Sequence, residues 1–439
     1  MIDILPNIIF SILLITSVGF FIYNIKKLIR VIKLGKPIDR SDNPKKRLYN
    51  MIRIALGQSK MVTKPISGFL HVIVYVGFII INIELLEILI DGVTGSHRFF
   101  SKYFNPNFYN FLIASFEILA FLVLISVILF WTRRNIVKIK RFLSSEMKGW
   151  PKFDADNILY FEVVLMLLFL SMNATDLILQ ERNFEGYYKA GSFPISSFIV
   201  PIFDSFETST VYVFERVFWW LHIIGIFFFL NYLYYSKHLH ILLAFPNTYY
   251  ANLENKGKSG ILESVKNEVL LMFYPEKASQ SNGDVDKFGA SDVLDLNWVQ
   301  LMNAYSCTEC GRCTSECPAN LTGKKLSPRK IMMDTRDRLE KVSKNITINK
   351  GKFVDDGDRL LDNYITKEEL WACTSCNACV EACPINIDPL SIIMDMRQYL
   401  IMEESSAHPD LNNMMNNIEN NGAPWPYNQQ DRELWIQES

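Results

Sequence analysis

Cysteine is missing from the first 306 residues of this chain, and all eight cysteines lie between Cys307 and Cys383. Disulfide frameworks belong mainly to secreted chains and need no such regular spacing, so the crowding indicates ligand cysteines in a reducing compartment. The sequence also has no glycine-rich nucleotide loop, no Ser/His/Asp set and no twin-cysteine CCG motif. We therefore expect that this chain does not perform two-electron substrate chemistry by itself.

The chain also has no excess of positive or negative charge, because it contains 45 Lys and Arg residues and 46 Asp and Glu residues. The charges are unevenly placed, since they are nearly absent from several long apolar runs and dense between them. This unevenness indicates a membrane and gives no sign of a nucleic-acid partner. With 439 residues, of which 49% are hydrophobic, the chain is long enough for two or three domains.

Five apolar segments are long enough to cross a bilayer, which requires about 20 residues of helix. We place them near 4–25, 66–90, 107–131, 157–180 and 212–236. The first segment does not have the form of a signal peptide, because no positive stretch precedes it and Lys26, Lys27 and Arg30 follow it directly. We therefore predict a five-helix transmembrane bundle in residues 1–245.

The short connections between these segments differ in positive charge. Connections 26–64 and 132–156 hold 19 Lys and Arg residues, whereas 91–106 and 181–211 hold four. Positively charged connections stay on the cytoplasmic side of a membrane. We therefore predict a multi-pass protein of the bacterial cytoplasmic membrane, with the N-terminus outside and the cysteine-rich half in the cytoplasm.

Two cysteine runs share the spacing C-x2-C-x2-C-x3-C-P, the first ending at Pro318 and the second at Pro384. In runs of this type three cysteines surround one [4Fe-4S] cluster, and the fourth reaches the neighbouring cluster. We predict two clusters with the following ligands: Cys307, Cys310, Cys313 and Cys383 for cluster 1, and Cys373, Cys376, Cys379 and Cys317 for cluster 2.

Zinc is the alternative occupant of a cysteine-rich motif. Zinc sites usually use two separated C-x2-C pairs for each ion. That arrangement leaves the third cysteine of each run and the proline after it unexplained.

The sequence beyond the fifth apolar segment divides into a linker, a cluster domain and a tail. The linker, 246–296, includes a stretch at 279–286 that is rich in Ser, Asn, Gly and Asp and indicates low order. The cluster domain, 297–404, contains helical patterns at 328–343 and 389–404, and Asp388 is placed to cap the second. The fold class is therefore all-α, with a transmembrane bundle followed by a helical two-cluster ferredoxin domain.

The tail, 405–439, allows two interpretations. It is either a docking segment for a partner protein or a disordered end. The residues that favour docking are Pro424, Trp425, Pro426 and Trp435.

Histidine inside a bilayer is costly, and we treat each such residue as a candidate site. His71 lies near the cytoplasmic end of the second segment, and His240 lies at the cytoplasmic end of the fifth. Imidazoles from two helices can bind the iron of b-type haem from both sides, so His71 and His240 are the preferred pair. The alternative is that each histidine only forms a hydrogen bond inside the bundle.

Two further histidines belong to the fifth segment. At about 100° per residue, His222 and His240 would project from one face of a continuous helix, about 27 Å apart. His222 has no histidine partner at its depth, so one haem is expected and a second is the alternative. His238 is expected at the surface or against a haem propionate.

The remaining polar residues of the membrane half receive plainer interpretations. We expect His97, and also His408 in the tail, to be solvated. Carboxylates in or near the apolar segments could relay protons to a quinone, but for the several that lie near helix ends a solvated or interfacial position is the simpler expectation. These are Glu84, Glu87, Glu117, Glu162 and Asp176.

Residues 288–337 and 370–388, which carry both cysteine runs, resemble the cluster domain of heterodisulfide-reductase-like iron–sulfur oxidoreductases. The segment YYSKHLH at 234–240 looks like the end of the fifth helix in membrane-bound members, including electron-transfer-flavoprotein:menaquinone oxidoreductases. The five-helix part is more loosely similar to the haem b subunit of respiratory nitrate reductase.

This resemblance implies a helical ferredoxin domain, haem b, and menaquinone or another quinone as the membrane substrate. His71, His222 and His240 match three of the four haem-ligand places of the nitrate-reductase-type bundle, whereas the fourth, near Ile81, is not histidine here. Fused relatives carry CCG domains that perform the catalytic step, so the resemblance implies a separate CCG-domain subunit as a partner. Electron transfer flavoprotein or another cytoplasmic dehydrogenase is the implied donor.

The sequence thus predicts the membrane subunit of a respiratory oxidoreductase that passes electrons between a cytoplasmic partner and the quinone pool. The direction of electron flow stays open. A membrane-bound redox sensor is the first alternative, and an anchored cluster domain without haem or quinone chemistry is the second.

Overall fold

The protein is described here by a computed structural model, which covers residues 4–255, 258, 263–277 and 287–437. Within these ranges the chain forms helices and no strand, and two isolated bridges pair Lys36 with Asn297 and Leu361 with Ile365. The predicted low-order stretch 279–286 lies outside the described residues.

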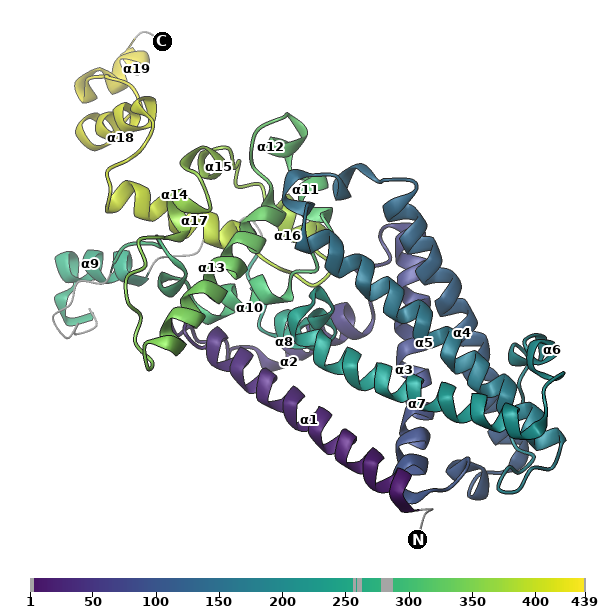
Figure 1. Cartoon of the computed structure of the whole chain (residues 1–439). Helices are drawn as coiled ribbons and strands as arrows, with labels where there is room; N and C mark the ends of the chain where they lie inside the picture. Colours follow the sequence, from purple (N-terminus) through teal and green to yellow (C-terminus); the bar gives the residue numbers. More distant parts are fainter. Residues whose placement is uncertain (1–3, 256–257, 259–262, 278–286, 438–439) are drawn as a thin grey trace.

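Five long helices form a bundle, which confirms the predicted five-helix architecture (Figure 1). Each of the first four has a proline in its first turn, where the missing N–H costs no helical hydrogen bond. At 1.5 Å per residue, helices of 25 to 32 residues exceed the ~30 Å hydrocarbon core of a bilayer. The helices are α1 (Leu5–Ile32), α3 (Pro65–Thr94), α4 (Pro106–Asn135), α5 (Trp150–Glu181) and α7 (Thr208–Tyr232).

The fifth segment is not one continuous helix as far as His240. Helix α7 ends at Tyr232, two short 3-10 turns follow, and Ser236 between them has an extended backbone with ψ of 151°. Helix α8 (His240–Tyr249) then begins in a new direction. The prediction that His222 and His240 share one helical face is therefore wrong. The sequence does not reveal the break, because no proline or glycine lies at it.

The cluster domain is built from short helices around one apolar core. Helix α13 runs five residues beyond the predicted end, and Asp388 caps α17 by accepting a hydrogen bond from the Ser391 N–H, as predicted. The helices are α10 (Trp298–Ser306), α11 (Arg312–Ser315), α12 (Pro318–Leu321), α13 (Pro328–Ile348), α14 (Leu360–Asn363), α15 (Lys367–Trp371), α16 (Ala378–Ala382) and α17 (Pro389–Met402).

The expected linker is partly structured. Helix α8 continues through Pro246, α9 spans Glu263–Phe273, and Ala290, Val293 and Leu296 are buried in the core of the cluster domain. The end of the predicted linker is therefore part of the cluster domain, because its apolar side chains pack against α13 and α17.

The loop after α1 joins the bundle to the cluster domain. The Lys36 N–H donates to the Leu296 carbonyl at 2.8 Å, and the Trp298 N–H donates to the Lys36 carbonyl at 3.1 Å. Gly35 allows this approach, because a Cβ there would lie 2.5 Å from the Trp298 nitrogen. The cluster domain consequently lies at one end of the bundle, and the N-terminus lies at the opposite end (Figure 1).

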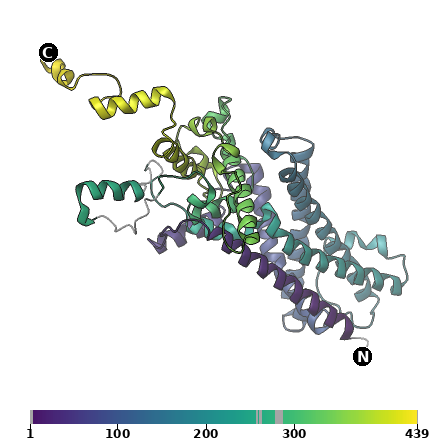
Figure 2. The same cartoon turned by 60° about the vertical axis from the view of Figure 1, so that its left-hand side comes forward.

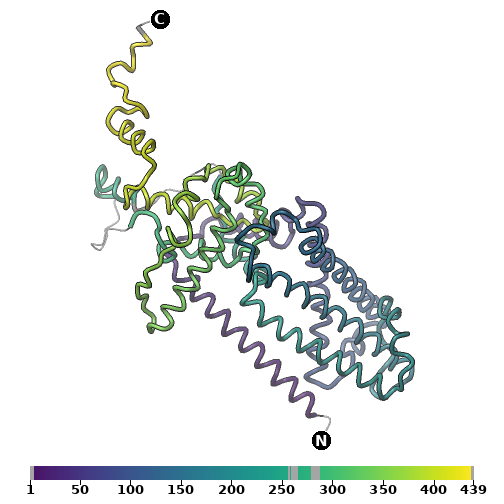
Figure 3. Tube along the Cα trace, turned by 45° about the horizontal axis from the view of Figure 1, so that its top comes forward, coloured from purple at the N-terminus to yellow at the C-terminus, as the bar shows by residue number. Residues whose placement is uncertain are grey.

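The tail contains helices and extends away from the rest of the chain (Figures 2 and 3). Helix α18 (Pro409–Asn421) has no buried residue, and α19 (Leu434–Gln437) follows it. Trp425 and Trp435 are exposed. Among the described residues, the α-helices not yet given are α2 (Pro44–Met51) and α6 (Val200–Phe203).

Candidate iron–sulfur and membrane redox sites

Each cysteine run folds as a loop followed by a short helix. Glu309 and Gly311 in the first loop have positive φ, and so do Ser375 and Asn377 at the equivalent positions of the second loop. Left-handed residues at these two positions turn backbone N–H groups inward, where they can donate hydrogen bonds to anionic sulfur. The internal repeat seen in the sequence is therefore also a repeat of backbone conformation.

The thiols of the first run gather with the last cysteine of the second run. Burial raises the pKa of Cys313 well above its usual range, and the nearby thiols of Cys307, Cys310 and Cys383 raise it further. Burial raises the pKa of Cys383 to about 11, and Cys310 contributes in the same direction. The sequence predicts these four cysteines as the ligands of cluster 1, and that assignment stays a prediction.

The other four thiols form a second group. Burial raises the pKa of Cys379 to about 12, and the thiols of Cys373 and Cys317 contribute to that rise. The pKa of Cys373 is raised by burial, with smaller contributions from Cys317 and Cys376. The sequence predicts these four cysteines as the ligands of cluster 2, and that assignment likewise stays a prediction. The two groups are neighbours, because Cys379 also acts on Cys313.

The environment of these thiols fits iron–sulfur ligation. Backbone N–H groups donate to sulfur, from Ser375 to Cys373 at 3.4 Å and from Ile387 to Cys383 at 3.3 Å. Such bonds stabilise thiolate ligands and tune cluster potential. Among the described residues, no three His, Cys, Asp or Glu side chains are arranged to hold a single metal ion. A cubane cluster holds its four sulfurs farther apart than one ion does.

The first cysteine loop is held by charged groups against the bundle. The buried Glu309 carboxylate accepts from Arg336 at 2.9 Å and pairs with Lys237, which follows α7. Although burial opposes the change, Lys237 and Arg336 hold the pKa of Glu309 below its usual range. Arg312 donates to the Lys60 and Met61 carbonyls, at 3.1 Å each. The loop is thus fixed on the segment that precedes α3.

Three of the predicted haem histidines lie together at this end of the bundle. The rings of His238 and His240 have their centroids 5.5 Å apart. The pKa of His238 is lowered to about 3, mainly by burial and to a smaller extent by His240 and His71. His238 is therefore not at the surface, since its side chain is only 16% exposed, with Nε2 3.7 Å from Glu162.

Ring nitrogens of two histidines are oriented by backbone carbonyls. Nδ1 of His240 donates to the Lys237 carbonyl at 3.1 Å, and Nδ1 of His222 donates to the Leu165 carbonyl at 3.1 Å. A carbonyl can only accept, so in each ring Nε2 is left unprotonated when the ring is neutral. Nδ1 of His71 is buried without a partner.

His222 lies apart from the other three. It is buried on α7, and its ring packs against Phe169 of α5 with centroids 5.7 Å apart. The bundle therefore contains a group of three histidines at the cluster end and a single histidine within α7.

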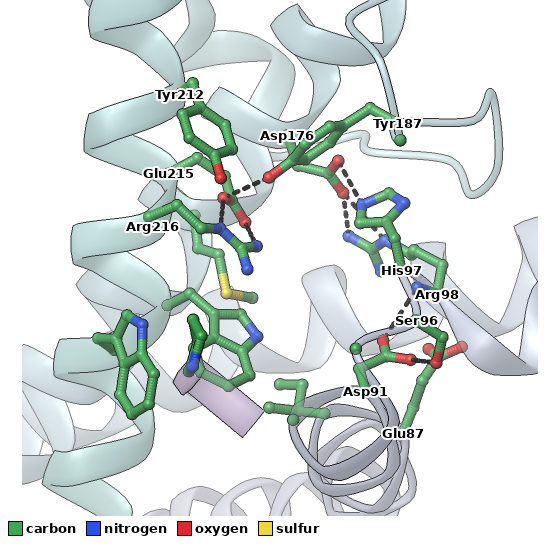
Figure 4. Close-up of a pocket in the computed structure, with 18 of the residues that line it drawn as sticks. Glu87, Asp91, Ser96, His97, Arg98, Asp176, Tyr187, Tyr212, Glu215 and Arg216 are labelled. Carbon is green, nitrogen blue, oxygen red and sulfur yellow. Dashed lines mark hydrogen bonds and ion pairs between the residues drawn. The ribbon is translucent and has the colours of Figure 1, made fainter. Parts of the chain in front are cut away.

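The opposite end of the bundle contains a cavity of about 890 Å³. Arg216 and Glu215 of α7 lie on one side, and His97 and Arg98 lie across from them, at the end of α3 (Figure 4). Phe10, Trp219 and Trp220 supply aromatic surface. The sequence interpretation missed Arg98, because its partners come from helices distant in the sequence.

Four of the membrane carboxylates are buried, so the expectation of a solvated position is wrong for them. Arg98 donates to Asp176 at 2.8 Å and to Glu84 at 3.3 Å, and Tyr109 donates to Glu87 at 3.0 Å. Glu117 accepts from the Ile195 and Ser196 N–H groups. Each carboxylate thereby accepts a hydrogen bond from a donor in the protein, as buried polar groups generally do. The sequence does not reveal these pairs, because most of them join residues far apart in the chain.

The two other histidines differ from each other. The prediction that His97 is solvated is wrong, because its Nε2 donates to Asp176 at 2.9 Å and the side chain is only 18% exposed. His408 is solvated as predicted, with a side chain that is 67% exposed.

Comparison with known proteins supports the iron–sulfur assignment. Residues 306–387 match the 4Fe-4S dicluster domain family. The chain is 29% identical to the probable iron-sulfur-binding oxidoreductase FadF of Bacillus subtilis, over 98% of this chain and 61% of that protein. It is 25% identical to the EtfAB:quinone oxidoreductase of Syntrophomonas wolfei, over 97% of this chain and 59% of that protein.

A shorter match involves heterodisulfide reductase. One subunit of the ferredoxin/F(420)H(2)-dependent CoB-CoM heterodisulfide reductase of Methanosarcina acetivorans is 29% identical over 26% of this chain and 56% of that protein. No solved structure matches the chain. The chain spans about three fifths of the length of the two relatives that it matches throughout.

These similarities confirm the resemblance to heterodisulfide-reductase-like membrane iron–sulfur oxidoreductases. They and the five apolar helices show a multi-pass membrane protein with a 4Fe-4S dicluster domain.

Proposed function

We propose that this chain is the electron-transfer subunit of a respiratory oxidoreductase, connecting a cytoplasmic redox partner with the quinone pool of the bacterial cytoplasmic membrane. One observation carries the proposal. The first cysteine loop is fixed by Arg312 to the segment leading into α3, and His71 lies within the first two turns of that helix. Candidate cluster ligands and candidate haem ligands are therefore neighbours across the domain boundary.

The two sets of four cysteines support two [4Fe-4S] clusters. Cluster 1 would be held by Cys307, Cys310, Cys313 and Cys383, and cluster 2 by Cys373, Cys376, Cys379 and Cys317. Each cluster, when bound, accepts and releases one electron at a time. The chain supplies burial and N–H donors, both of which affect the reduction potential.

The histidine group is our basis for proposing one b-type haem near the cluster domain, which His71 and His240 would hold through its iron. A ligand imidazole commonly donates its other ring N–H to a carbonyl, which fixes the ring and its tautomer. His240 does so through Lys237, and the unpartnered Nδ1 of His71 is a candidate ligand atom or donor. His238 would pack beside the haem. The His222 ring is oriented in the same way, by its hydrogen bond to the Leu165 carbonyl. It could hold a second haem only if the second iron ligand is not one of the histidines of this chain.

The cavity at the opposite end of the bundle is our proposed site for menaquinone or another quinone. Its aromatic side chains suit a flat ring, and its carboxylates and tyrosines suit a head group that takes up protons on reduction. The Tyr187 hydroxyl donates to Glu215 at 2.6 Å, which offers a protonatable pair at the cavity wall. The positions of the basic connections support an outside location for this cavity.

Our proposal includes a partner that supplies the substrate chemistry. We propose a separate CCG-domain iron–sulfur subunit, with electron transfer flavoprotein or another cytoplasmic dehydrogenase as the soluble donor. The similarity to a protein named EtfAB:quinone oxidoreductase supports this class of partner. The exposed tryptophans of the tail, Trp425 and Trp435, offer it a surface. Electrons can move in either direction through the same parts.

A reduced-minus-oxidised optical spectrum of the detergent-purified chain tests this function, with pyridine haemochrome and iron measured on the same sample. We expect about eight iron atoms in clusters and one haem b per chain. The His71→Ala and His240→Ala variants should lose that haem, whereas His408→Ala, which alters an exposed histidine of the tail, should retain it.

Other outcomes separate the alternatives. Clusters without haem in the unsubstituted chain would contradict the haem route and favour a redox sensor or an anchored cluster domain. Two haems per chain, one of them lost in His222→Ala, would show that His222 has a ligand partner that the sequence does not reveal.

A further inference from the structure

The two cysteine loops are equivalent in sequence and backbone but not in their surroundings. Both have the same cysteine spacing and the same pair of left-handed residues. Differences in accessibility between them therefore come from what packs on each loop. One loop is covered by the membrane half, and the other faces solvent.

Burial of the first loop is nearly complete. Glu309, Gly311 and Arg312 are buried, and their neighbours include Lys237 from the bundle side. Arg329 extends the contact, because it donates to the Arg141 carbonyl at 2.7 Å, in the connection between α4 and α5. A soluble protein could not reach this loop without displacing part of the bundle.

The second loop is open at the corresponding positions. Thr374, Ser375 and Cys376 are all exposed, and Cys376 is the one exposed thiol of the eight cysteines. The loop is supported from behind by α17, where Arg397 donates to the Leu370 carbonyl at 3.0 Å. Because α17 packs on one side of the loop, the opposite side is open to solvent and to a partner protein.

An exposed apolar side chain lies on the helix that follows Cys317, a cysteine of the same thiol group. Leu321 is 70% exposed at the end of α12, which begins directly after Cys317, a member of the second thiol group. An ion pair between Lys325 and Glu368, at 2.6 Å, joins the segment after α12 to α15, just ahead of Cys373. Figure 1 shows α12 and α15 near each other at the top of the cluster domain.

We propose that the loop 374–376 and Leu321 form the docking surface through which a soluble redox protein exchanges electrons with this chain. This inference rests on the proposed electron-transfer function. Cys317, Cys373, Cys376 and Cys379 would hold the cluster that exchanges one electron with the centre of the partner in either direction, and no covalent bond would change. The group containing Cys307, adjacent to the bundle, then faces the membrane acceptor.

The surface indicates the kind of partner. Its rim carries both signs of charge, as the Lys325–Glu368 pair shows, so no strong field of one sign selects the partner. A small contact with an apolar centre suits a transient electron-transfer encounter, which commonly buries less than about 1,200 Å². We therefore expect a soluble redox protein with its centre near an apolar patch, and a weak dependence of the exchange rate on salt.

A blocking experiment on the full-length chain tests the surface. Thr374→Cys and Lys352→Cys each introduce one exposed thiol, the first in the loop and the second in the loop after α13. Each thiol is coupled to a 5 kDa polyethylene glycol maleimide, and the unsubstituted chain should take no label because its cysteines bind clusters. The electron donors are free reduced methyl viologen and reduced viologen coupled to dextran, a donor of protein size.

We expect the label at position 374 to slow cluster reduction by dextran-linked viologen at least tenfold, and to change the rate with free viologen less than twofold. The label at position 352 should change neither rate more than twofold. An unchanged dextran rate with the label at 374, or equal slowing by both labels, would overturn the proposal.

Labelling rates give a second readout that does not depend on electron transfer. Thr308 is the equivalent of Thr374 in the covered loop and is only partly exposed. We expect Thr374→Cys to react with maleimide at least tenfold faster than Thr308→Cys, and equal rates would contradict the asymmetry. Failure of the proposed function appears differently, as clusters that are reduced while no haem signal follows.

Discussion

Arg47 illustrates at the residue scale how this chain stabilises a buried charge. Its guanidinium is 1% exposed, pairs with Asp42, and donates to the Tyr249 and Ala251 carbonyls at 3.1 and 3.0 Å. These bonds join α2 to the end of α8. A buried ion must satisfy all its donors, and here main-chain carbonyls accept most of them.

Removal of this guanidinium should destabilise the contact between α2 and α8. We predict that Arg47→Met lowers the free energy of unfolding by about 3 kcal/mol, because two carbonyls lose a charged donor. Thermal unfolding in detergent, followed by tryptophan fluorescence, measures the effect. Arg53→Met, at an exposed position nearby, is the control and should change stability little. Equal effects of the two substitutions would contradict the role assigned to Arg47.

Asp395 gives stability a pH dependence. Burial raises its pKa from 3.8 to about 6, although Gln300 donates to the carboxylate at 2.6 Å. A carboxyl with a raised pKa binds its proton more tightly in the folded chain, so its contribution is full below pH 3.8 and is lost as the pH rises through about 6. The loss above pH 6 is about 3 kcal/mol at most.

Asp395→Asn should remove this pH dependence. We predict that the variant unfolds at a higher temperature than the parent at pH 7.5, and that the difference shrinks toward about pH 4. Asp410→Asn alters an exposed carboxylate of the tail and should leave the profile unchanged. An Asp395→Asn profile parallel to that of the parent between pH 4 and 8 would refute the assignment.

At the scale of elements, the contact between the loop after α1 and the start of α10 depends on one missing side chain. A Cβ at Gly35 would lie 2.5 Å from the Trp298 nitrogen and 2.7 Å from the Asn297 carbonyl carbon. Both atoms belong to backbone, which cannot move aside as a flexible side chain could. The Trp298 indole also donates to the Ile38 carbonyl at 3.1 Å.

We predict that Gly35→Ala separates this loop from α10 and costs about 1 to 3 kcal/mol, as overpacking typically does. The unfolding midpoint should fall, and limited proteolysis should cut between α1 and α2 more quickly. Gly19→Ala is the matched control, because a Cβ in the middle of α1 meets nothing within 4 Å. That change should be neutral or slightly stabilising, since alanine favours helix. Similar losses in both variants would contradict the close-approach argument.

The elements differ in how far local sequence determines them. The five long helices were predictable because apolar length alone defines a membrane span, and the cap at Asp388 was predictable because it depends on neighbours in the chain. The break at Ser236 was not, because no local signal marks it. Its position depends on contacts with α5, where Asp154 accepts from the Lys237 N–H at 3.0 Å.

The same division applies to the candidate sites. The cysteine groups followed from spacing, because three ligands of each set lie in one loop. The buried network around Arg98 and Asp176 did not, since its members lie 78 residues apart and each alone looks like an interfacial charge. Likewise the asymmetry of the two cysteine loops arises only when one of them packs against the bundle.

At the scale of the whole molecule, the cluster domain lies at one end of the bundle and the N-terminus at the other (Figure 1), where Pro6, Asn7 and Phe10 of α1 help to line the cavity. If electrons enter at the cluster domain in the cytoplasm and reach quinone at the cavity, charge crosses the membrane with each turnover. The orientation of the chain in the membrane therefore determines the direction in which charge would cross the membrane. The distribution of Lys and Arg in the connections predicts that orientation.

Reporter fusions check the orientation directly. We predict that alkaline phosphatase fused after residue 102, in the connection between α3 and α4, is active, because the proposed orientation puts that connection outside the cell. The same enzyme fused after residue 148, in the connection between α4 and α5, should be inactive, and green fluorescent protein at that point should fluoresce. The reverse pattern would place the clusters outside, where no cytoplasmic dehydrogenase could reach the loop at 374–376, and would remove the physical basis for the proposed partner.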